Sequence, residues 1–429
     1  MTRPATTGPR TEWLGSWRVR LALLAALVAT GLVPVLTDHG RWLGSWKVAL
    51  DTATFSVTLL GPCAAGIAAT IYVRVRRSQV ADLFAASPRP WQAWLAPAVG
   101  VWLLATLGLV LIALFTTATA WLAGAYAEPA LAWILLATSA VIAAQVAIGA
   151  LIGGTTGQYW SAPWAAVATF TLFILTSIGV IPVVFRTGGV SGALAGETFD
   201  PATFAFQAVV AVGLAAGAMA LSHRDLFALA SRGGKALTVL TALTAVVALL
   251  GFSHGRERYV PASSVTYECR EGRPTVCLPR DARRPLGDLF VQAQEVARHL
   301  EAAGAVVPAR FVATPPGVSP EPGDGVIHFQ DDEDLAAHVD VLVAARSLAT
   351  PARCGAFFSD DPRALPDTYF PTFRALVGWL LVQVGEVSPP ADEEGWWRLP
   401  VTQQRPWVRA TYDALADCRL GDLHPPEVR

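Results

Sequence analysis

Charged residues are scarce in this chain, and long stretches before residue 253 carry almost none. They make up 15% of the 429 residues, whereas soluble globular proteins carry about 25%. The hydrophobic share is 53%, and the mean hydropathy is +0.44. A run of about 20 apolar residues is long enough to cross the hydrocarbon core of a bilayer. This composition excludes an ordinary soluble protein and indicates an integral membrane protein with an extramembrane domain at its C-terminal end.

The sequence also lacks the motifs of common catalytic and nucleotide-binding sites. In its only Gly-Lys pair, Lys235 follows Leu229 by six residues and precedes Ala236, where a P-loop requires glycine and serine or threonine. No His-Glu-x-x-His, Gly-x-Ser-x-Gly or cysteine–histidine pattern is present. We therefore expect no catalytic residues, no cofactor and no bound nucleotide, and we do not expect an enzyme.

Acidic residues are missing from the interior of the apolar segments. Asp51 lies at a membrane edge, and Gln145 with scattered Ser and Thr side chains supplies the main polar groups inside. Buried acids mark proton-coupled and ion-coupled transporters. Their absence argues against that class and favours energy supplied from elsewhere, and a lipid-like or amphipathic cargo would not require intramembrane charge.

The apolar segments predict seven membrane spans. Residues 1–18 then form a cytoplasmic N-terminus with an interfacial helix, 19–235 a six-span transmembrane domain and 236–252 a seventh helix. The first and last segments are short, so each could instead be an interfacial or buried helix. The first could also be a cleaved signal peptide, although it lacks a small-x-small cleavage site. The predicted spans are Val19–Leu36, Asp51–Val73, Ala93–Ala125, Ala130–Ile152, Trp164–Phe185, Phe204–Leu221 and Ala236–Phe252.

The basic residues of the short loops predict the orientation, because lysine and arginine gather in cytoplasmic loops. With a cytoplasmic N-terminus, the outside loops carry only Arg41, Lys47 and Arg186 before the last span. Seven crossings then place residues 253–429 outside, so we expect a multi-pass protein of the plasma membrane with an extracytoplasmic C-terminal domain. The basic residues expected inside are Arg3, Arg10, Arg18, Arg20, Arg74, Arg76, Arg77, Arg89, Arg224, Arg232 and Lys235.

The pentapeptide Trp-Leu-Gly-Ser-Trp occurs twice, at Trp13–Trp17 and Trp42–Trp46, on opposite sides of the first predicted span. Because tryptophan prefers the headgroup level of a bilayer, we interpret the two copies as interfacial anchors. The first copy, beside Arg18 and Arg20, predicts a short helix on the inner surface. A chance duplication in a tryptophan-rich chain is the alternative.

Residues 253–429 differ from the rest of the chain in charge. They contain 18 arginines, no lysine and 25 acidic residues, a net charge of −7, whereas residues 1–252 contain 14 basic and 8 acidic residues, net +6. An acidic domain argues against nucleic acid as a partner. The expected fold class is mostly α, a polytopic transmembrane helix bundle followed by a small mixed α/β extracytoplasmic domain. Its expected strands are Val265–Cys269, Thr275–Leu278, Phe311–Thr314 and Val326–Gln330, and its expected helices are Leu286–Ala303, Tyr369–Val384 and Trp407–Leu420.

Four of the five cysteines lie in this domain, and Cys63 lies in the second predicted span. An even number of cysteines in an oxidising compartment predicts disulfides. Three pairings are open; we favour Cys269–Cys277, which flank a Gly-Arg-Pro turn, together with Cys354–Cys418. Four free thiols are the alternative. A zinc site is disfavoured, because the spacing of the first pair exceeds that of a zinc knuckle.

The loop between the second and third spans is the most informative local stretch. Arg74, Arg76 and Arg77 end the span at the inner headgroups, and residues 79–86 predict two helical turns. Such an amphipathic cytoplasmic helix could dock a peripheral subunit, or it could rest on the membrane surface as a plain connector. The remaining residues assigned to this element are Val80, Leu83 and Phe84 on its apolar face, with Asp82 and Arg89.

At this stretch the sequence resembles the membrane subunits of ABC-2-type exporters from actinobacteria. The shared features are Gly61-Pro62 in the second span, the arginine-rich exit, a short acidic-Leu-Leu helix (here Asp82-Leu83-Phe84) and the Pro88-Arg89 that precedes the third span. The resemblance covers about half of the chain. It implies a separate ABC ATPase subunit and either a homodimer or a heterodimer of permeases; the seventh span and the outer domain depart from the six-span pattern.

Polar clusters in the C-terminal domain are weak metal-site candidates. Glu295 and His299 lie one turn apart on a predicted helix, and a denser cluster surrounds His328 and His338. Aspartate and histidine could bind a metal there. A solvated acidic loop that opens a helix at Leu335 is the favoured interpretation. The acidic residues of that cluster are Asp331, Asp332, Glu333 and Asp334.

Three functions are therefore compared. We expect a membrane-spanning permease subunit of an ABC-type exporter that works with a separate ATPase chain. The alternative is a membrane-anchored extracytoplasmic binding or sensory protein, which the large outer domain favours. A membrane-embedded enzyme has no catalytic constellation to support it.

The predicted orientation has a direct test. A periplasmic-type phosphatase fused after Arg429 should be active, and a cytoplasmic fluorescent reporter at the same position should stay dark, because seven crossings place this end outside. The opposite pattern would contradict the orientation and would remove the oxidising compartment on which the disulfide prediction depends.

Overall fold

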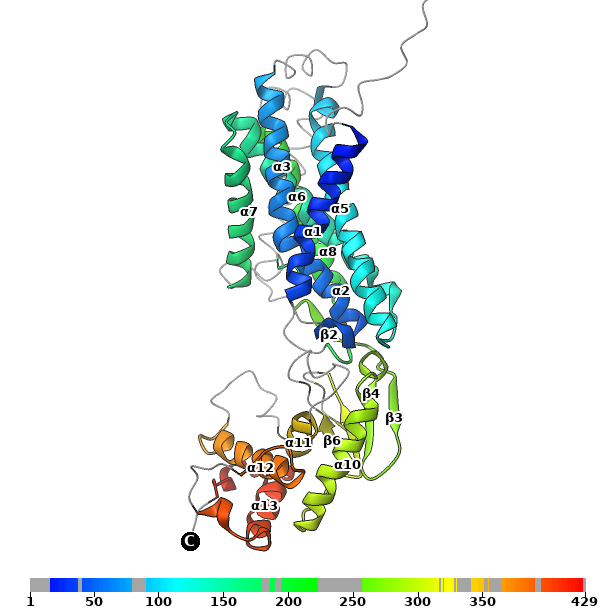
Figure 1. Ribbon diagram of the computed structural model, residues 1–429, viewed down its shortest axis with the longest axis vertical. Coiled ribbons are helices and arrows are strands. Elements are labelled where there is room, and N and C mark those ends of the chain that lie inside the picture. The colour runs from blue at the N-terminus through cyan, green and yellow to red at the C-terminus, as the bar shows by residue number, and fades with distance from the viewer. Residues whose placement is uncertain are drawn as a thin grey trace, which may run out of the picture.

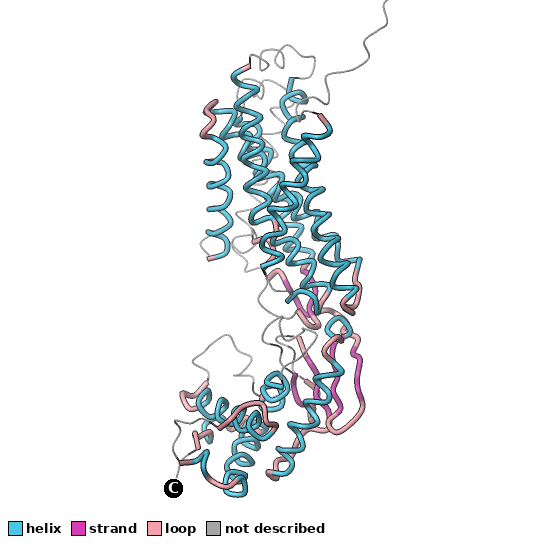
Figure 2. Tube along the Cα trace, viewed as in Figure 1, coloured by secondary structure: helices cyan, strands magenta, loops and turns pink. Residues whose placement is uncertain are grey.

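The structure is a computed structural model, elongated, with a bundle of long helices at one end and a domain of strands and shorter helices at the other (Figure 1). The strands lie in the C-terminal domain and where it meets the bundle (Figure 2). The residues that the structure describes are 16–37, 41–78, 90–178, 186–189, 194–222, 257–315, 318, 320–327, 329, 341–350, 354, 365–389 and 395–426.

Five helical stretches of the bundle are long and apolar enough to cross a membrane. A sixth apolar helix, α7 (Ser161–Ser177), is shorter, with 17 residues. The chain is therefore a multi-pass membrane protein. The five stretches are α1 (Trp17–Thr37), α2 (Trp46–Phe55) continued by α3 (Val57–Arg77), α5 (Pro90–Leu122), the 3₁₀ turn η2 (Pro129–Trp133) continued by α6 (Ile134–Thr156), and α8 (Pro201–Ser222).

The first six predicted spans overlap these helices, with the larger differences at the fifth and the second. The fifth was predicted to end at Phe185, whereas α7 ends at Ser177, and residues 179–185 lie outside the described residues. The second was predicted to start at Asp51, but α2 begins at Trp46, and Ser56 separates α2 from α3. Lys47 and Asp51 are therefore helical residues at the end of a 32-residue stretch. The seventh predicted span, 236–252, lies outside the described residues.

The last described residue of α8, Ser222, and the next described residue of the chain, Glu257, lie at opposite ends of that helix. At the end of α8, the Ser222 hydroxyl accepts a hydrogen bond from Trp94 Nε1, near the start of α5, at 2.8 Å. At its start, Thr203 Oγ1 donates to the carbonyl of Glu257 at 2.9 Å. A helix of 22 residues is about 33 Å long. Ser222 and Glu257 are therefore separated by the length of the bundle.

Small residues allow α3 and α6 to pack closely at the centre of the bundle. A Cβ atom added to Gly149 would lie 2.1 Å from the Ala65 carbonyl oxygen, and one added to Gly153 would lie 2.3 Å from that of Ala69. In lipid, helices gain little from burying apolar surface against one another, so close backbone approach through small residues drives their association. The glycine and alanine pattern therefore makes α3 and α6 a tightly packed pair.

The two copies of Trp-Leu-Gly-Ser-Trp have different surroundings. Trp17 begins α1 and is 65% exposed, as expected of an interfacial anchor. Trp42 lies in the 3₁₀ helix η1 (Arg41–Gly44), is buried and donates its indole N–H to the Val35 carbonyl at 3.3 Å. The interfacial interpretation is wrong for Trp42, because its ring packs inside the bundle instead of facing the headgroups.

The C-terminal domain has a four-stranded sheet with the order β3-β4-β5-β6. β3 and β4 form the predicted antiparallel hairpin, and β5 and β6 extend it in parallel. The predicted mixed α/β class is confirmed. A helix was expected to open at Leu335; residues 330–340 lie outside the described residues, and α11 is described from Val341. The strands are β3 (Tyr267–Arg270), β4 (Thr275–Pro279), β5 (Arg310–Ala313) and β6 (Gly325–Ile327), and the helices are α10 (Leu286–Ala302), α11 (Val341–Ala349), α12 (Tyr369–Gln383) and α13 (Val401–Ala416). Three short 3₁₀ turns complete it, η4 (Arg280–Ala282), η7 (Trp396–Arg398) and η8 (Leu420–Asp422).

A two-stranded sheet joins the bundle to this domain. Strand β1 (Glu197–Phe199) directly precedes α8, and β2 (Tyr259–Pro261) begins the described part of the C-terminal domain. The two strands are antiparallel, with Thr198 opposite Val260. The backbone of the C-terminal domain is therefore hydrogen-bonded to the bundle at its first described strand.

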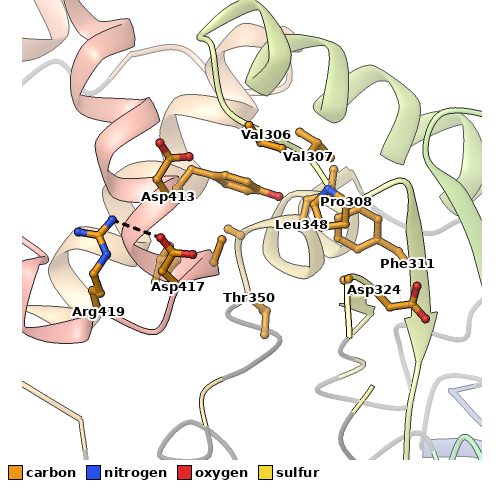
Figure 3. A pocket seen from close by; sticks show the side chains of 16 residues that line it. Val306, Val307, Pro308, Phe311, Asp324, Leu348, Thr350, Asp413, Asp417 and Arg419 are labelled. Atoms are coloured by element: carbon orange, nitrogen blue, oxygen red, sulfur yellow. Dashed lines mark ion pairs between the residues drawn. The ribbon is translucent and has the colours of Figure 1, made fainter. Parts of the chain in front are cut away.

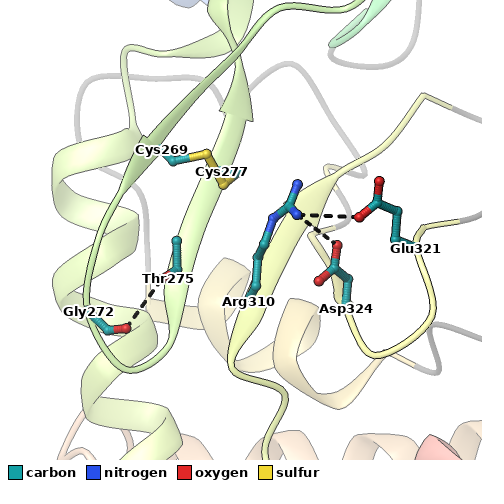
Figure 4. The surroundings of a disulfide bond; sticks show 7 residues. All are labelled: Cys269, Gly272, Thr275, Cys277, Arg310, Glu321 and Asp324. Atoms are coloured by element: carbon teal, nitrogen blue, oxygen red, sulfur yellow. Dashed lines mark hydrogen bonds and ion pairs between the residues drawn. A yellow bond between two sulfur atoms is a disulfide. The ribbon is translucent and has the colours of Figure 1, made fainter.

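Both disulfides of the C-terminal domain follow the pairing that the sequence favoured. Cys269 and Cys277 are direct cross-strand partners on β3 and β4, with their Cα atoms 4.1 Å apart (Figure 4). Cys354 pairs with Cys418 across 64 residues of sequence. Cys63 in α3 is a free thiol.

These pairings predict a simple chemical result. After alkylation without reduction and proteolysis, we expect one peptide pair linked through Cys269 and Cys277 and a second linked through Cys354 and Cys418, with only Cys63 alkylated. Because the second bond closes the longer loop, replacing both of its cysteines by alanine should destabilise the domain more, by about 4 kcal/mol against about 2.5 kcal/mol for the first. Alkylation of any of the four domain cysteines in the native protein would contradict the pairing.

Candidate functional site

The structure describes only part of the predicted coupling loop. Arg74, Arg76 and Arg77 end α3, at the end of the bundle away from the C-terminal domain (Figure 1). The residues of the proposed helix lie outside the described residues, so its amphipathic face stays a prediction. Of the residues assigned to the loop, Val80, Asp82, Leu83 and Phe84 in this helix and Arg89 after it lie outside the described residues.

The arginines at the end of α3 are tied to the turn between α6 and α7. Arg76 Nη1 donates to the carbonyl of Gly154 at 2.7 Å and also to that of Thr155. Arg77 Nε donates to the carbonyl of Gly157 at 2.7 Å, and its guanidinium lies 4.4 Å from the centre of the Tyr159 ring. The last carbonyls of a helix have no partner within the helix and favour cations. The end of α6 thus fixes the point at which the loop leaves the bundle.

The point at which the chain re-enters the bundle is also fixed. The Tyr72 hydroxyl of α3 donates to the carbonyl of Trp94 in the first turns of α5 at 2.5 Å, and the two rings meet edge to face at 4.9 Å. Trp94 in turn bonds Ser222 of α8. Both ends of the interval 79–89 are therefore held by hydrogen bonds to the central helices.

At the opposite end of the bundle, Lys47 of α2 reaches into the C-terminal domain. Its ammonium pairs with the carboxylate of Asp281 in η4 and donates to the carbonyl of Glu197 in β1. The side chains of Lys47 and Asp281 are 5% and 10% exposed. Removing one partner from a buried ion pair leaves an uncompensated charge in a low dielectric, so this contact resists separation of the bundle and the domain.

A second buried ion pair lies one turn further along α2, with the charges reversed. Asp51 Oδ1 lies 3.4 Å from Nη2 of Arg258 and accepts a hydrogen bond from the Tyr259 hydroxyl at 2.8 Å. The Arg258 guanidinium also lies 4.8 Å from the centre of the Phe204 ring of α8. Two residues one turn apart on α2, a lysine and an aspartate, therefore each form an ion pair with a residue that comes after α8 in the sequence. We call Lys47, Asp281, Asp51 and Arg258, with Tyr259, the junction.

Two further acids lie near Lys47. Burial raises the pKa of the Glu128 carboxyl, while Lys47 opposes that rise. Burial likewise raises the pKa of Glu197, again against the effect of Lys47. Within the described part of the chain, Glu128 Oε2 is buried without a hydrogen-bond partner. Protonation of either acid therefore removes the repulsion between its carboxylate and that of Asp281.

The polar interior predicted from Gln145 is a small cavity between α6, α7 and α8. It has a volume of about 40 Å³ and is also lined by Thr169, Thr176 and Thr187. Gln145 Oε1 is buried there without a hydrogen-bond partner among the described residues, and a Cβ atom at Gly61 would lie 1.7 Å from it. A space of this size accommodates water and is too small for an organic cargo.

Groups of acidic and histidine side chains do not form a metal centre in the described part of the chain. Glu295 lies 3.8 Å from Arg298 on the exposed face of α10. The cluster from His328 to His338, with Asp331, Asp332, Glu333 and Asp334, lies outside the described residues.

No family model, no curated protein and no solved structure matches this chain. The resemblance to ABC-2-type permease subunits therefore stays a prediction. What is shown is a multi-span helical membrane protein with a C-terminal mixed α/β domain that holds two disulfides.

The junction predicts a large difference between two substitutions that each remove one carboxylate charge. Asp281→Asn removes the carboxylate that pairs with the buried Lys47 ammonium, although Glu128 and Glu197 remain near it, and should cost about 3–5 kcal/mol of stability in detergent, measured by chemical denaturation. Glu268→Gln, which removes the exposed partner of Arg280 and Arg283, should cost about 0–1 kcal/mol. The double substitution Lys47→Met with Asp281→Leu should recover most of the loss. Equal effects of the two single substitutions would contradict the junction.

Proposed function

We propose that this protein is the membrane-spanning permease subunit of an ABC-type exporter and that its ATPase is a separate chain. The observation that carries the proposal is the fixation of both ends of the interval 79–89 at one end of the bundle. Arg76 and Arg77 hold the end of α3 to the α6–α7 turn, and Tyr72 holds the start of α5. A partner that binds this interval and moves it would transmit that movement directly to the tightly packed helices α3 and α6.

The charges of the bundle support an external source of energy. The buried ionisable groups Lys47, Asp51 and Arg258 belong to the junction at the end of the bundle, and Gln145 is the most polar side chain of the cavity among the helices. Ion-coupled transporters place acids within the membrane, and the predicted spans hold none in their interior. An ATPase subunit bound at the cytoplasmic end would supply the work instead.

The positions of the described ends support the membrane orientation that this role requires. Arg74, Arg76 and Arg77 lie at the end of the bundle opposite the junction, as the positive-inside rule requires of a cytoplasmic end. Because Ser222 and Glu257 lie at opposite ends of α8, we propose that the segment 236–252 spans the membrane. The C-terminal domain is then extracytoplasmic, which agrees with its two disulfides.

One observation favours a second candidate, a membrane-anchored binding or sensory protein. The stretch Trp46–Arg77 is continuous in hydropathy and joins the junction to the arginines at the other end. The same link that would carry work outward from an ATPase could carry a signal inward from a ligand of the C-terminal domain. The two functions differ in their cytoplasmic partner.

The double substitution Leu83→Asp with Phe84→Asp tests the coupling role. It places two charges on the predicted apolar face of the loop, so a docked ATPase chain should be lost from the purified complex while expression and membrane insertion stay unchanged. The measurement is co-purification from native membranes, with the ATPase identified by its Walker motifs in mass spectrometry.

The matched control is Ala81→Asp with Ala85→Asp, which adds the same charge to the same loop on the other side of the predicted helix. This variant should retain the ATPase. If the Leu83 and Phe84 variant retains the partner at full yield, this loop does not couple the two chains. If the wild-type protein captures no ATPase, the sensory function is the better account.

A further inference from the structure

The C-terminal domain contains a pocket of about 530 Å³ at the edge of its sheet. Figure 3 shows its two main walls: Asp413 of α13 and Asp417, which directly follows that helix, on one side, and Val306 and Pro308, which follow α10, on the other. The volume falls within the range of small-molecule sites. The pocket lies in the C-terminal domain, away from the loop and the junction, so the inference below does not depend on the proposed transport function.

Tyr412 is a buried residue of this pocket whose hydroxyl has no hydrogen-bond partner among the described residues. The residue is 4% exposed and lines the pocket. Buried tyrosine hydroxyls usually find a partner, as Tyr259 does with Asp51 at 2.8 Å. Burial raises the pKa of Tyr412, so the hydroxyl stays protonated and offers both a donor and an acceptor.

The charged groups that line the pocket are predominantly negative: among its described lining residues are Asp324, Asp413 and Asp417, with Arg419 as the one cation. Arg310 pairs with Asp324 at 3.6 Å and Arg409 pairs with Asp413 at 3.7 Å, but neither arginine lines the pocket. Arg419 is already engaged, with Asp422 at 2.8 Å and Asp417 at 3.6 Å. The helices α11 and α13 also end at the pocket, and the C-terminal end of a helix attracts cations.

The remaining wall is apolar and selects against a bare metal ion. Val306, Phe311 and Leu348 contribute hydrocarbon surface to the pocket. The carboxylates of the described residues do not gather closely enough to form a metal centre. A ligand that satisfies both walls carries a positive charge at one end and an apolar body at the other.

We propose that this pocket binds a small organic amine in its ammonium form, with the charged end beside Asp413 and Asp417 and the apolar end against Val306 and Phe311. The ammonium donates hydrogen bonds to the carboxylates, and the Tyr412 hydroxyl joins them as an acceptor. Three donors of an ammonium group suit such a set of oxygens. The domain would thus recognise an amphipathic amine outside the cell.

Three probes of one shape test the charge preference on the full-length protein in lipid nanodiscs. They are 4-phenylbutylamine, 4-phenylbutanol and 4-phenylbutyrate, and binding is measured by isothermal titration calorimetry at neutral pH. The amine should bind at least about tenfold more tightly than the alcohol, and the carboxylate should bind most weakly. Equal affinity for amine and alcohol, tighter binding of the carboxylate, or no binding of the amine at millimolar concentration would each overturn the proposal.

Substitutions locate the site. Tyr412→Phe removes only the hydroxyl and should weaken amine binding by about threefold to tenfold, while Asp417→Asn should weaken it further. Asp422→Asn is the matched control, because Asp422 pairs with the same arginine and does not line the pocket; it should bind the amine like the wild type. Unchanged affinity in both pocket variants would overturn the assignment. If a pocket variant does not fold, competition for the wild-type site between the amine and its alcohol analogue decides the charge preference.

Discussion

The buried ion pairs at the junction are the contacts on which the rest of this architecture depends. The bundle is otherwise a membrane structure that holds its helices together through small residues, and the C-terminal domain has a core and disulfides of its own. Lys47 with Asp281, and Asp51 with Arg258, join the two parts. Because each pair is almost fully buried, separating the parts would expose apolar surface and leave opposite charges unpaired.

The junction lies at the start of the stretch Trp46–Arg77, and the arginines that anchor the loop lie at its end. Arg76 is hydrogen-bonded to the carbonyl of Gly154 in α6, and α6 packs against α3 through glycines. A displacement of the loop ends would therefore reach the C-terminal domain through packed helices and buried charges. This link is compatible with the proposed work of an ATPase and with a signal from the amine proposed to bind in the pocket of the C-terminal domain.

Local patterns in the sequence predicted much of the fold, because hydropathy, turn residues and cysteine spacing act over short distances. The helices of the bundle and the hairpin with Cys269 and Cys277 were predicted in this way. The contacts of the candidate site join distant residues: Arg76 and Gly154 are 78 positions apart, and Asp51 and Arg258 are 207 apart. The sequence shows that Asp51 lies at the edge of a predicted span. It does not show which distant residue pairs with this charge, so Arg258 could not be predicted as its partner.

In this structure the bundle and the C-terminal domain form one body, joined at the junction. Spin labels attached through Trp160→Cys at the far end of the bundle and Val306→Cys in the C-terminal domain test it by pulsed electron–electron double resonance, in a Cys63→Ala background and in lipid nanodiscs. Both positions are exposed, and the four domain cysteines are held in disulfides. The account predicts a single narrow distance distribution; a broad or multiple distribution would show that the junction does not hold the two parts together.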